Sequence, residues 1–355
     1  MGQPSRPADA PVRPAGHRIP RVAPLLFVLL LQTAQNPSPM TDSTRPHPRV
    51  AQYEAPGRRI ALSTGTLYIP PTFAPGGRHA IVVHFHGAPW LVEHHVTTHL
   101  PQAALVTVHL GAGSRVYGEA FSEEGRLTRL LEEVSKHLTG AFGAPVAFDL
   151  VALSSFSAGY GAVRSILRQP PEYRRVDAVL LADSLHAAYA GESAGPRTAD
   201  LPVETPDLVP FLAFARDAAA GRKRLLVTHS EVFPGTFAST TETADVLLRD
   251  LALTRRPVLR EGPVGMQNLS EARRGEFHLR GFAGNSAPDH LDHLYGLGEY
   301  LGELTSLLPG ASAGGIESPV QKNRPLPDLQ ATGGWRTIPA VTYSPTRLPT
   351  QYHRR

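Results

Sequence analysis

The sequence predicts an α/β fold with a mostly parallel central sheet flanked by helices. The first observation is that short apolar runs, typical of buried strands, alternate with segments of helical periodicity. The second is residues 148–167, which pass directly from an apolar run to a helical pattern through a turn of small residues. The third is composition, because 355 residues with 41% hydrophobic side chains can bury one large core.

Charge and cysteine content narrow the classes of function. The formal net charge is only +4, and a good part of the arginine lies in the two terminal segments. We therefore expect no nucleic acid among the partners. Cysteine is absent, which excludes disulfides, thiolate metal sites and a catalytic cysteine.

The two ends of the chain differ in composition from its centre. Residues 1–34 combine a basic region, an apolar run at 24–31 and the small residue Ala34, which is the pattern of a secretory signal peptide. The run is too short to span a bilayer, so we expect no stable membrane span in the mature chain. This pattern predicts an exported protein, periplasmic or extracellular; an ordinary N-terminal extension and an uncleaved anchor are the alternatives. We expect a linker at 35–57, a folded domain at 58–308 and a Pro/Gly-rich disordered tail at 309–355.

In the first half of the domain, two short strands are expected to form a hairpin at the edge of the sheet. Pro70 and Pro71 close the second of them. Two longer apolar runs predict buried strands, and leucines at helical spacing predict an amphipathic helix. In order, these elements are residues 59–64, 66–70, 79–86, 103–110 and the helix 125–138.

The second half continues the alternation. Strands are expected at residues 176–182, 224–229 and 276–282, and helices at 239–253 and up to 304. Ser239 and Glu242 fit a capping box at the start of the first of these helices. Residues 185–221 hold a Gly/Pro-rich stretch and a helix near 208–220, which predicts a small lid where ligands bind in open α/β sheets.

Residues 155–159, which we call the elbow, carry a candidate nucleophile. Ser155-Phe156-Ser157-Ala158-Gly159 matches the G-x-S-x-G pattern with serine in place of the first glycine. The preceding strand and following helix would raise the Ser157 hydroxyl at the top of the sheet, with the Ala158 backbone N–H beside it. The alternative is that these residues form a serine-rich strand-to-helix loop with no catalytic role.

The elbow, an upstream His-Gly segment and a late histidine resemble the α/β-hydrolase superfamily, which includes serine esterases, lipases and peptidases. The resemblance covers about residues 58–308. It implies a serine hydrolase that cleaves a small carboxylic ester through an acyl-enzyme, with no cofactor and no metal. It also implies that Gly87 or Ala88, after His86, supplies the second oxyanion N–H.

The resemblance places the general base after the last strand and the acid after one of two earlier strands. His290 is the preferred base, because it lies where loop meets helix, and His293 is the alternative. Asp183 is the preferred acid, because it ends an apolar strand, and Glu231 is the alternative. Asp289 and Asp292 are expected to cap their helix.

The residues leave several points open. Candidate substrate-binding side chains are His86, Trp90, Phe156, Tyr160 and His186, and each of them is as compatible with a place in the core. A peptidase or amidase, a non-catalytic binding protein, and a metal hydrolase built on His84, His86, His94 and His95 are the competing functions. The sequence predicts neither the substrate nor the oligomeric state.

Overall fold

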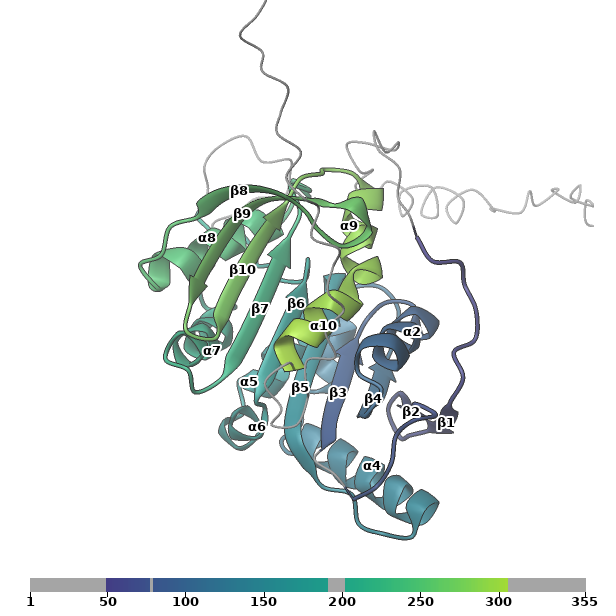
Figure 1. The fold of residues 1–355 in the computed structure, drawn as a ribbon. Helices are drawn as coiled ribbons and strands as arrows, with labels where there is room; N and C mark the ends of the chain where they lie inside the picture. The colour runs from purple at the N-terminus through teal and green to yellow at the C-terminus, as the bar shows by residue number, and fades with distance from the viewer. Residues whose placement is uncertain (1–48, 77–78, 191–201, 306–355) are drawn as a thin grey trace, which may run out of the picture. The chain divides into compact units, whose positions relative to one another are not determined.

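The computed structural model describes residues 49–76, 79–190 and 202–305 (Figure 1). The predicted signal peptide, the C-terminal tail and the middle of the predicted lid lie outside these ranges. Within them, no helix is long and apolar enough to cross a bilayer.

A single sheet runs through the described part of the chain. Its ten strands lie in the order β1-β2-β4-β3-β5-β6-β7-β10-β9-β8. The first five strands are β1 (Arg58–Ala61), β2 (Thr66–Ile69), β3 (His79–Phe85), β4 (Ala103–Val108) and β5 (Phe148–Phe156). The others are β6 (Ala178–Ala182), β7 (Arg224–His229), β8 (Arg256–Glu261), β9 (Gln267–Arg274) and β10 (Phe277–Phe282).

The α/β prediction is confirmed, but the sheet is less parallel than expected. Six central strands, from β4 to β10 in the sheet order, pair in parallel. Both margins are antiparallel, with the predicted β1–β2 hairpin at one edge and β8–β9 at the other. The sequence did not predict the β8–β9 margin, because the residues of β8 are mostly exposed and show no apolar alternation.

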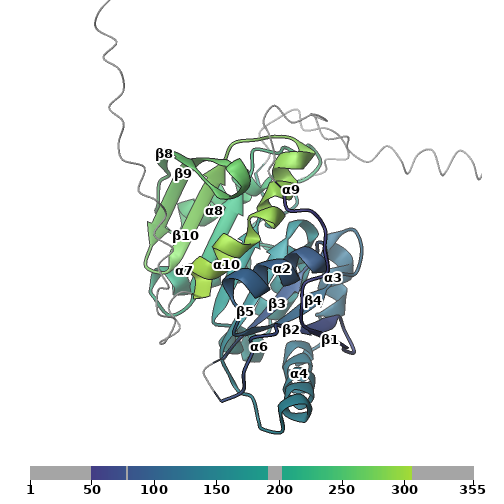
Figure 2. The same cartoon turned by 45° about the vertical axis from the view of Figure 1, so that its right-hand side comes forward.

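Helices cover both faces of the sheet. The described α-helices are α2 (Pro89–His99), α3 (Ser114–Ala120), α4 (Arg126–Phe142), α5 (Tyr160–Leu167), α6 (Pro170–Arg175), α7 (Val209–Ala219), α8 (Thr240–Asp250), α9 (Ala287–Tyr295) and α10 (Leu297–Thr305). Figure 2 shows α2 and α10 together over one face. Their apolar residues join one buried cluster, and those of α3, α4, α5, α7 and α8 join another.

Strand alternation divides the core between these two clusters. In β3, Ile81, Val83 and Phe85 belong to one cluster, whereas Ala80 and Val82 belong to the other. All seven residues of β3 are buried, as expected for a central parallel strand covered on both sides.

The predicted lid is not confirmed by the residues described. Helix α7, which corresponds to the helix predicted within the lid, instead buries Phe211, Phe214, Ala215 and Ala218 in the main core. These positions follow the spacing of a helix that packs on a sheet, so α7 is a flanking element.

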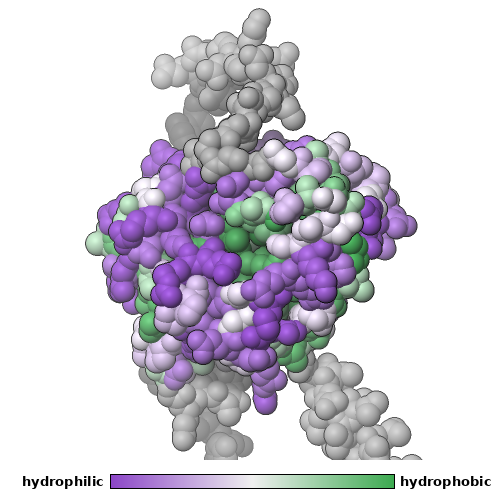
Figure 3. Space-filling view, turned by 90° about the horizontal axis from the view of Figure 1, so that it is seen from below, coloured by the Kyte–Doolittle hydropathy of each residue, from purple (hydrophilic) through white to green (hydrophobic). Residues whose placement is uncertain are grey.

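The surface seen in Figure 3 is mostly hydrophilic around a hydrophobic area near its centre.

The capping box predicted at α8 is present, with the Ser239 hydroxyl accepting from the Glu242 amide and the Glu242 carboxylate accepting from the Ser239 amide. A second capping box, between Ser286 and Asp289, starts α9.

Candidate active site

The elbow forms the sharp passage from β5 to α5. Strand β5 ends at Phe156, a single 3₁₀ turn covers Ser157–Gly159, and α5 begins at Tyr160. Ser157 has φ 48°, a left-handed conformation that is costly for a residue with a side chain. A Cβ on Gly159 would lie 2.1 Å from the carbonyl oxygen of Phe85. Glycine therefore lets the turn pack directly against the end of β3.

Asp183 lies at the end of β6, one strand from the elbow, and is 1% exposed. Its Oδ1 accepts from the backbone N–H of Ser230 at 2.9 Å and from the Thr240 hydroxyl. Its Oδ2 accepts from the Ser230 hydroxyl at 2.6 Å and from His290 Nδ1 at 2.6 Å. The carboxylate is thus held by donors on both oxygens.

These donors decide the charge of Asp183. Burial alone would raise its pKa, but the nearby histidines and the hydrogen bonds from His290 and Ser230 outweigh burial and hold the pKa well below its usual value. Asp183 is therefore an anion at neutral pH. Its contact with His290 assigns the Nδ1 proton to the histidine, which leaves Nε2 able to accept a proton.

His290 lies beside the elbow. Its ring stacks on Phe156, the residue before Ser157, with the ring centroids 4.6 Å apart. Its side chain is 24% exposed and therefore partly accessible. The structure thus brings an Asp–His pair and the candidate nucleophile to the same end of the sheet.

The alternative base and acid have other partners. His293 is fully buried, its Nδ1 is 2.8 Å from the Thr228 hydroxyl, and burial lowers its pKa to about 4. The exposed Glu231 accepts from the backbone N–H of Gly284 at 3.2 Å. In the described part of the chain, only His290 and Asp183 among the four candidates are hydrogen-bonded to each other.

The two aspartates of α9, Asp289 and Asp292, have different roles. Asp289 caps the helix with Ser286, as predicted. Asp292 is fully buried and pairs with Arg49 at 2.9 Å, so the prediction that it caps the helix is wrong.

The His-Gly turn follows β3, the strand beside β5. His86 and Gly87 have φ 69° and φ 118°, and the buried His84 supports the turn from below. His84 Nε2 donates to the His86 carbonyl at 2.7 Å, and Nδ1 accepts from the Ser154 hydroxyl at 2.9 Å. Burial lowers the pKa of His84 to about 4, so the ring is neutral at pH 7. Because β3 and β5 are parallel neighbours, the turn and the elbow share one end of the sheet.

Aromatic and histidine rings surround this end of the sheet. His86 lies 6.0 Å from Phe156, ring to ring, and its Nδ1 is 2.9 Å from the Tyr117 hydroxyl. On the other side of the elbow, Tyr160 meets His186 edge to face at 5.6 Å, and His186 meets Phe237 at 5.0 Å. Phe237 was not predicted to lie here, because no local sequence pattern marks it; the structure shows it 38% exposed.

Trp90 lines a cavity that the other candidate substrate-binding residues do not line. It lies edge to face against Tyr295 at 6.4 Å and lines a cavity of about 650 Å³ together with Arg59 and Glu93. That cavity has none of the other substrate-binding candidates in its lining.

The four histidines of the metal hypothesis have separate partners. His84 and His86 hold the turn described above, His94 Nδ1 lies 2.6 Å from the Tyr53 hydroxyl, and His95 Nε2 donates to the Leu294 carbonyl at 3.1 Å. Across the described ranges, no group of three or more His, Cys, Asp or Glu side chains could hold a metal ion.

Sequence reasoning missed the hydroxyl groups around the acid. Ser230 and Thr240 hold Asp183, and the Ser184 hydroxyl donates to the Ser157 carbonyl at 2.8 Å. The only signal was the position of Ser230 directly after β7 and of Ser184 two residues after the end of β6, where the sheet presents its site; Thr240, the first residue of α8, had none.

The chain therefore combines a parallel-centred sheet, a strand–elbow–helix passage and an adjoining Asp–His pair. No protein-family model and no curated protein matches the sequence. Among solved structures, the chain is similar to the enterobactin esterase from Shigella flexneri (16% identity, TM-score 0.42), covering 73% of this chain and 61% of that one. It is also similar to the esterase Pf2001 from Pyrococcus furiosus (10% identity, TM-score 0.37, 73% and 97% covered). The carboxylesterase CesB from Bacillus subtilis is a third (10% identity, TM-score 0.35, 73% and 93% covered).

Proposed function

We propose that the protein is a serine hydrolase that cleaves a small carboxylic ester, with Ser157 as nucleophile, His290 as general base and Asp183 as the acid that orients the base. The observation that carries the proposal is the 2.6 Å hydrogen bond between His290 and a buried, anionic Asp183, with the same His290 ring stacked on the residue before Ser157. The proposal includes export through residues 1–34.

The reaction follows from these roles. His290 Nε2 takes the Ser157 proton while Oγ bonds to the ester carbonyl carbon, and the negative charge moves to the carbonyl oxygen. The imidazolium, stabilised by Asp183, then gives its proton to the departing alcohol. Water, deprotonated by His290, then attacks the acyl-enzyme, and the proton returns from His290 to Ser157 as the acid leaves. No cofactor is required.

Two backbone N–H groups are proposed to bind the oxyanion. One is that of Ala158 in the elbow, and the other is that of Gly87 or Ala88 in the turn held by His84. Loss of one such donor costs about 3 kcal/mol of transition-state stabilisation. Both donors come from neighbouring strand ends, which fixes their separation before substrate arrives.

The test is labelling of the full chain with a fluorophosphonate probe and hydrolysis of short p-nitrophenyl esters. Ser157→Ala should abolish both, whereas Ser165→Ala, a matched serine whose hydroxyl donates to the Gly118 carbonyl, should change neither. His290→Ala should abolish turnover, and a folded His293→Ala should retain most of it. Labelling that persists in Ser157→Ala, or activity that depends on a metal removable by chelator, would refute the proposal.

A further inference from the structure

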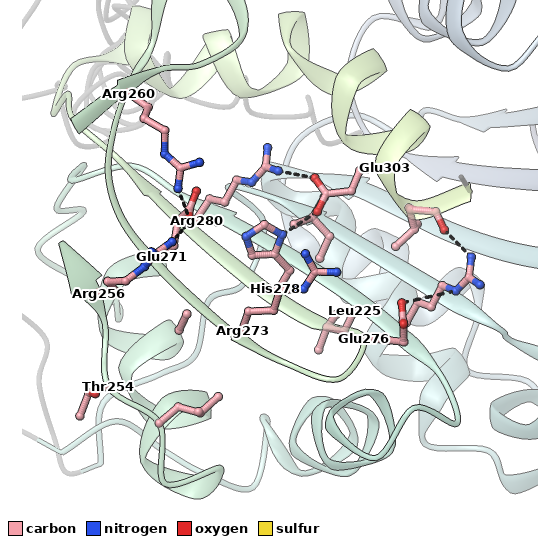
Figure 4. A pocket seen from close by; sticks show the side chains of 15 residues that line it. Leu225, Thr254, Arg256, Arg260, Glu271, Arg273, Glu276, His278, Arg280 and Glu303 are labelled. Atoms are coloured by element: carbon pink, nitrogen blue, oxygen red, sulfur yellow. Dashed lines mark hydrogen bonds and ion pairs between the residues drawn. The ribbon is translucent and has the colours of Figure 1, made fainter. Parts of the chain in front are cut away.

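A cavity of about 780 Å³ lies at the β8 margin of the sheet, where β7, β10, β9 and β8 meet the end of α10 (Figure 4). None of the proposed catalytic residues lines it. Its charged lining consists of five arginines and three glutamates, together with His278, so positive charge is in excess by two. The arginines are Arg224, Arg256, Arg260, Arg273 and Arg280, and we call this cavity the arginine pocket.

Strand register explains why these side chains share one face. Arg256 pairs with Glu271, and Glu271 pairs with Arg280, which makes a row across three strands. The next row joins Arg273 to His278. The intervening residues Ala272, Phe277 and Leu279 are buried in the core of the other face, so the charged residues point together into the pocket.

The carboxylates of the pocket are already engaged. Glu303 of α10 bonds His278 at 2.6 Å and also Arg280. Glu271 bonds Arg260 at 2.5 Å and Arg256 at 3.2 Å. These pairs engage four of the basic side chains of the pocket.

Arg273 is different from its neighbours. It is exposed, and its side chain makes no hydrogen bond or ion pair with any residue that the structure describes, although its charge helps to lower the pKa of Glu303. The Nε of Arg280, in the adjacent row, is buried and has no hydrogen-bond partner within the same ranges. The pocket therefore contains guanidinium donors that the described residues leave unused.

We propose that the arginine pocket binds a small molecule with at least two anionic groups, phosphate or carboxylate, with Arg273 as its central contact. Guanidinium groups bind both kinds of anion through paired N–H donors. A volume of about 780 Å³ falls within the range of small-molecule sites, roughly 300 to 1,000 Å³. The site is separate from the proposed hydrolase site and does not depend on its activity.

The terminal segments of this chain do not have the charge to fill the pocket. Residues 1–48 carry five arginines against two aspartates. Residues 306–355 carry five arginines and Lys322 against only Glu317 and Asp328. Both segments are net positive and would be repelled by the excess charge of the pocket, which favours a separate anionic ligand.

Calorimetric titration of the full chain with inorganic pyrophosphate, and separately with citrate, tests the proposal at about 100 mM NaCl, where exposed charges are largely screened beyond about 10 Å. At least one probe should bind the parent with a one-to-one stoichiometry. Arg273→Gln should weaken that binding by about tenfold or more, as expected for the loss of a charge-assisted contact.

The matched control is Arg58→Gln, an exposed strand arginine outside the pocket, which should bind as the parent does. Ser157→Ala should also bind normally, which separates this site from the proposed active site. Binding of pyrophosphate identifies phosphate as the ligand chemistry, and binding of citrate identifies carboxylate. Failure of both probes to bind the parent, or equal weakening by Arg58→Gln and Arg273→Gln, would overturn the proposal.

Discussion

Replacing Asp183 by asparagine tests the proposed triad most directly, because the two oxygens of the carboxylate have different partners. Oδ1 accepts from the Ser230 backbone N–H, which can only donate. Oδ2 accepts from the Ser230 hydroxyl and from His290 Nδ1, both of which can reverse and accept. The amide NH₂ of an asparagine should therefore take the place of Oδ2, with its oxygen in the place of Oδ1.

This orientation determines the state of His290. An NH₂ facing Nδ1 makes that nitrogen the acceptor, so the ring proton moves to Nε2 and the base can no longer take the Ser157 proton. A serine hydrolase locked in the wrong histidine tautomer loses about 10⁴-fold in kcat. The corresponding loss of transition-state stabilisation is about 5 kcal/mol, with little change in KM because substrate contacts are intact.

The assay is steady-state hydrolysis of a p-nitrophenyl ester, with circular dichroism to confirm folding. The matched control is Glu231→Gln, the same carboxylate-to-amide change at an exposed position, which should keep kcat within about twofold, as usual for a surface substitution. If Asp183→Asn keeps more than about a tenth of the parent kcat, or Glu231→Gln loses as much, the role assigned to Asp183 is refuted.

Two further predictions concern stability. Burial holds the pKa of His84 and His293 at about 4, against 6.5 for an ordinary histidine, so the unfolded chain binds more protons between these values. The free energy of unfolding should therefore fall as pH drops from 6.5 toward 4. In urea titrations, His84→Gln should reduce the slope of this free energy against pH by up to about 1.4 kcal/mol per pH unit. An unchanged slope would contradict the buried neutral state of His84. Gly159→Ala should lower stability by about 2 kcal/mol or more, because its Cβ meets the Phe85 carbonyl oxygen at 2.1 Å. Gly140→Ala, inside α4 with no atom within 4 Å of the added carbon, should raise stability by up to about 1 kcal/mol; equal melting temperatures for the two variants would contradict the packing at the elbow.

Local patterns were enough to predict the central strands and the elbow. The buried run before Ser157 and the helical spacing after it are both read from neighbouring residues, and both elements are present. The core role of α7 was also readable, since Phe211, Phe214, Ala215 and Ala218 lie at helical spacing. It was missed because the Gly/Pro-rich stretch before it favoured a lid.

Other features depend on contacts between distant residues. His290 and His293 lie three residues apart on α9, and only the fold shows that the first meets Asp183 and the second meets Thr228. Strand β8 has charged residues on both sides and no apolar period, so its pairing with β9 has no local signal. The hydroxyl partners of Asp183 come from 47 and 57 positions away, beyond the reach of any local pattern.

Backbone strain is concentrated at the proposed site. Among the described residues, five other than glycine have positive φ, and three of them are His86, Ser157 and Asp183. Each left-handed residue with a side chain costs about 1 kcal/mol or more relative to glycine. Ser157→Gly should therefore give an inactive chain that is harder to unfold than the parent. The side chains at these three positions therefore lower the folding stability of the chain, which is the usual relation between a strained site and its activity.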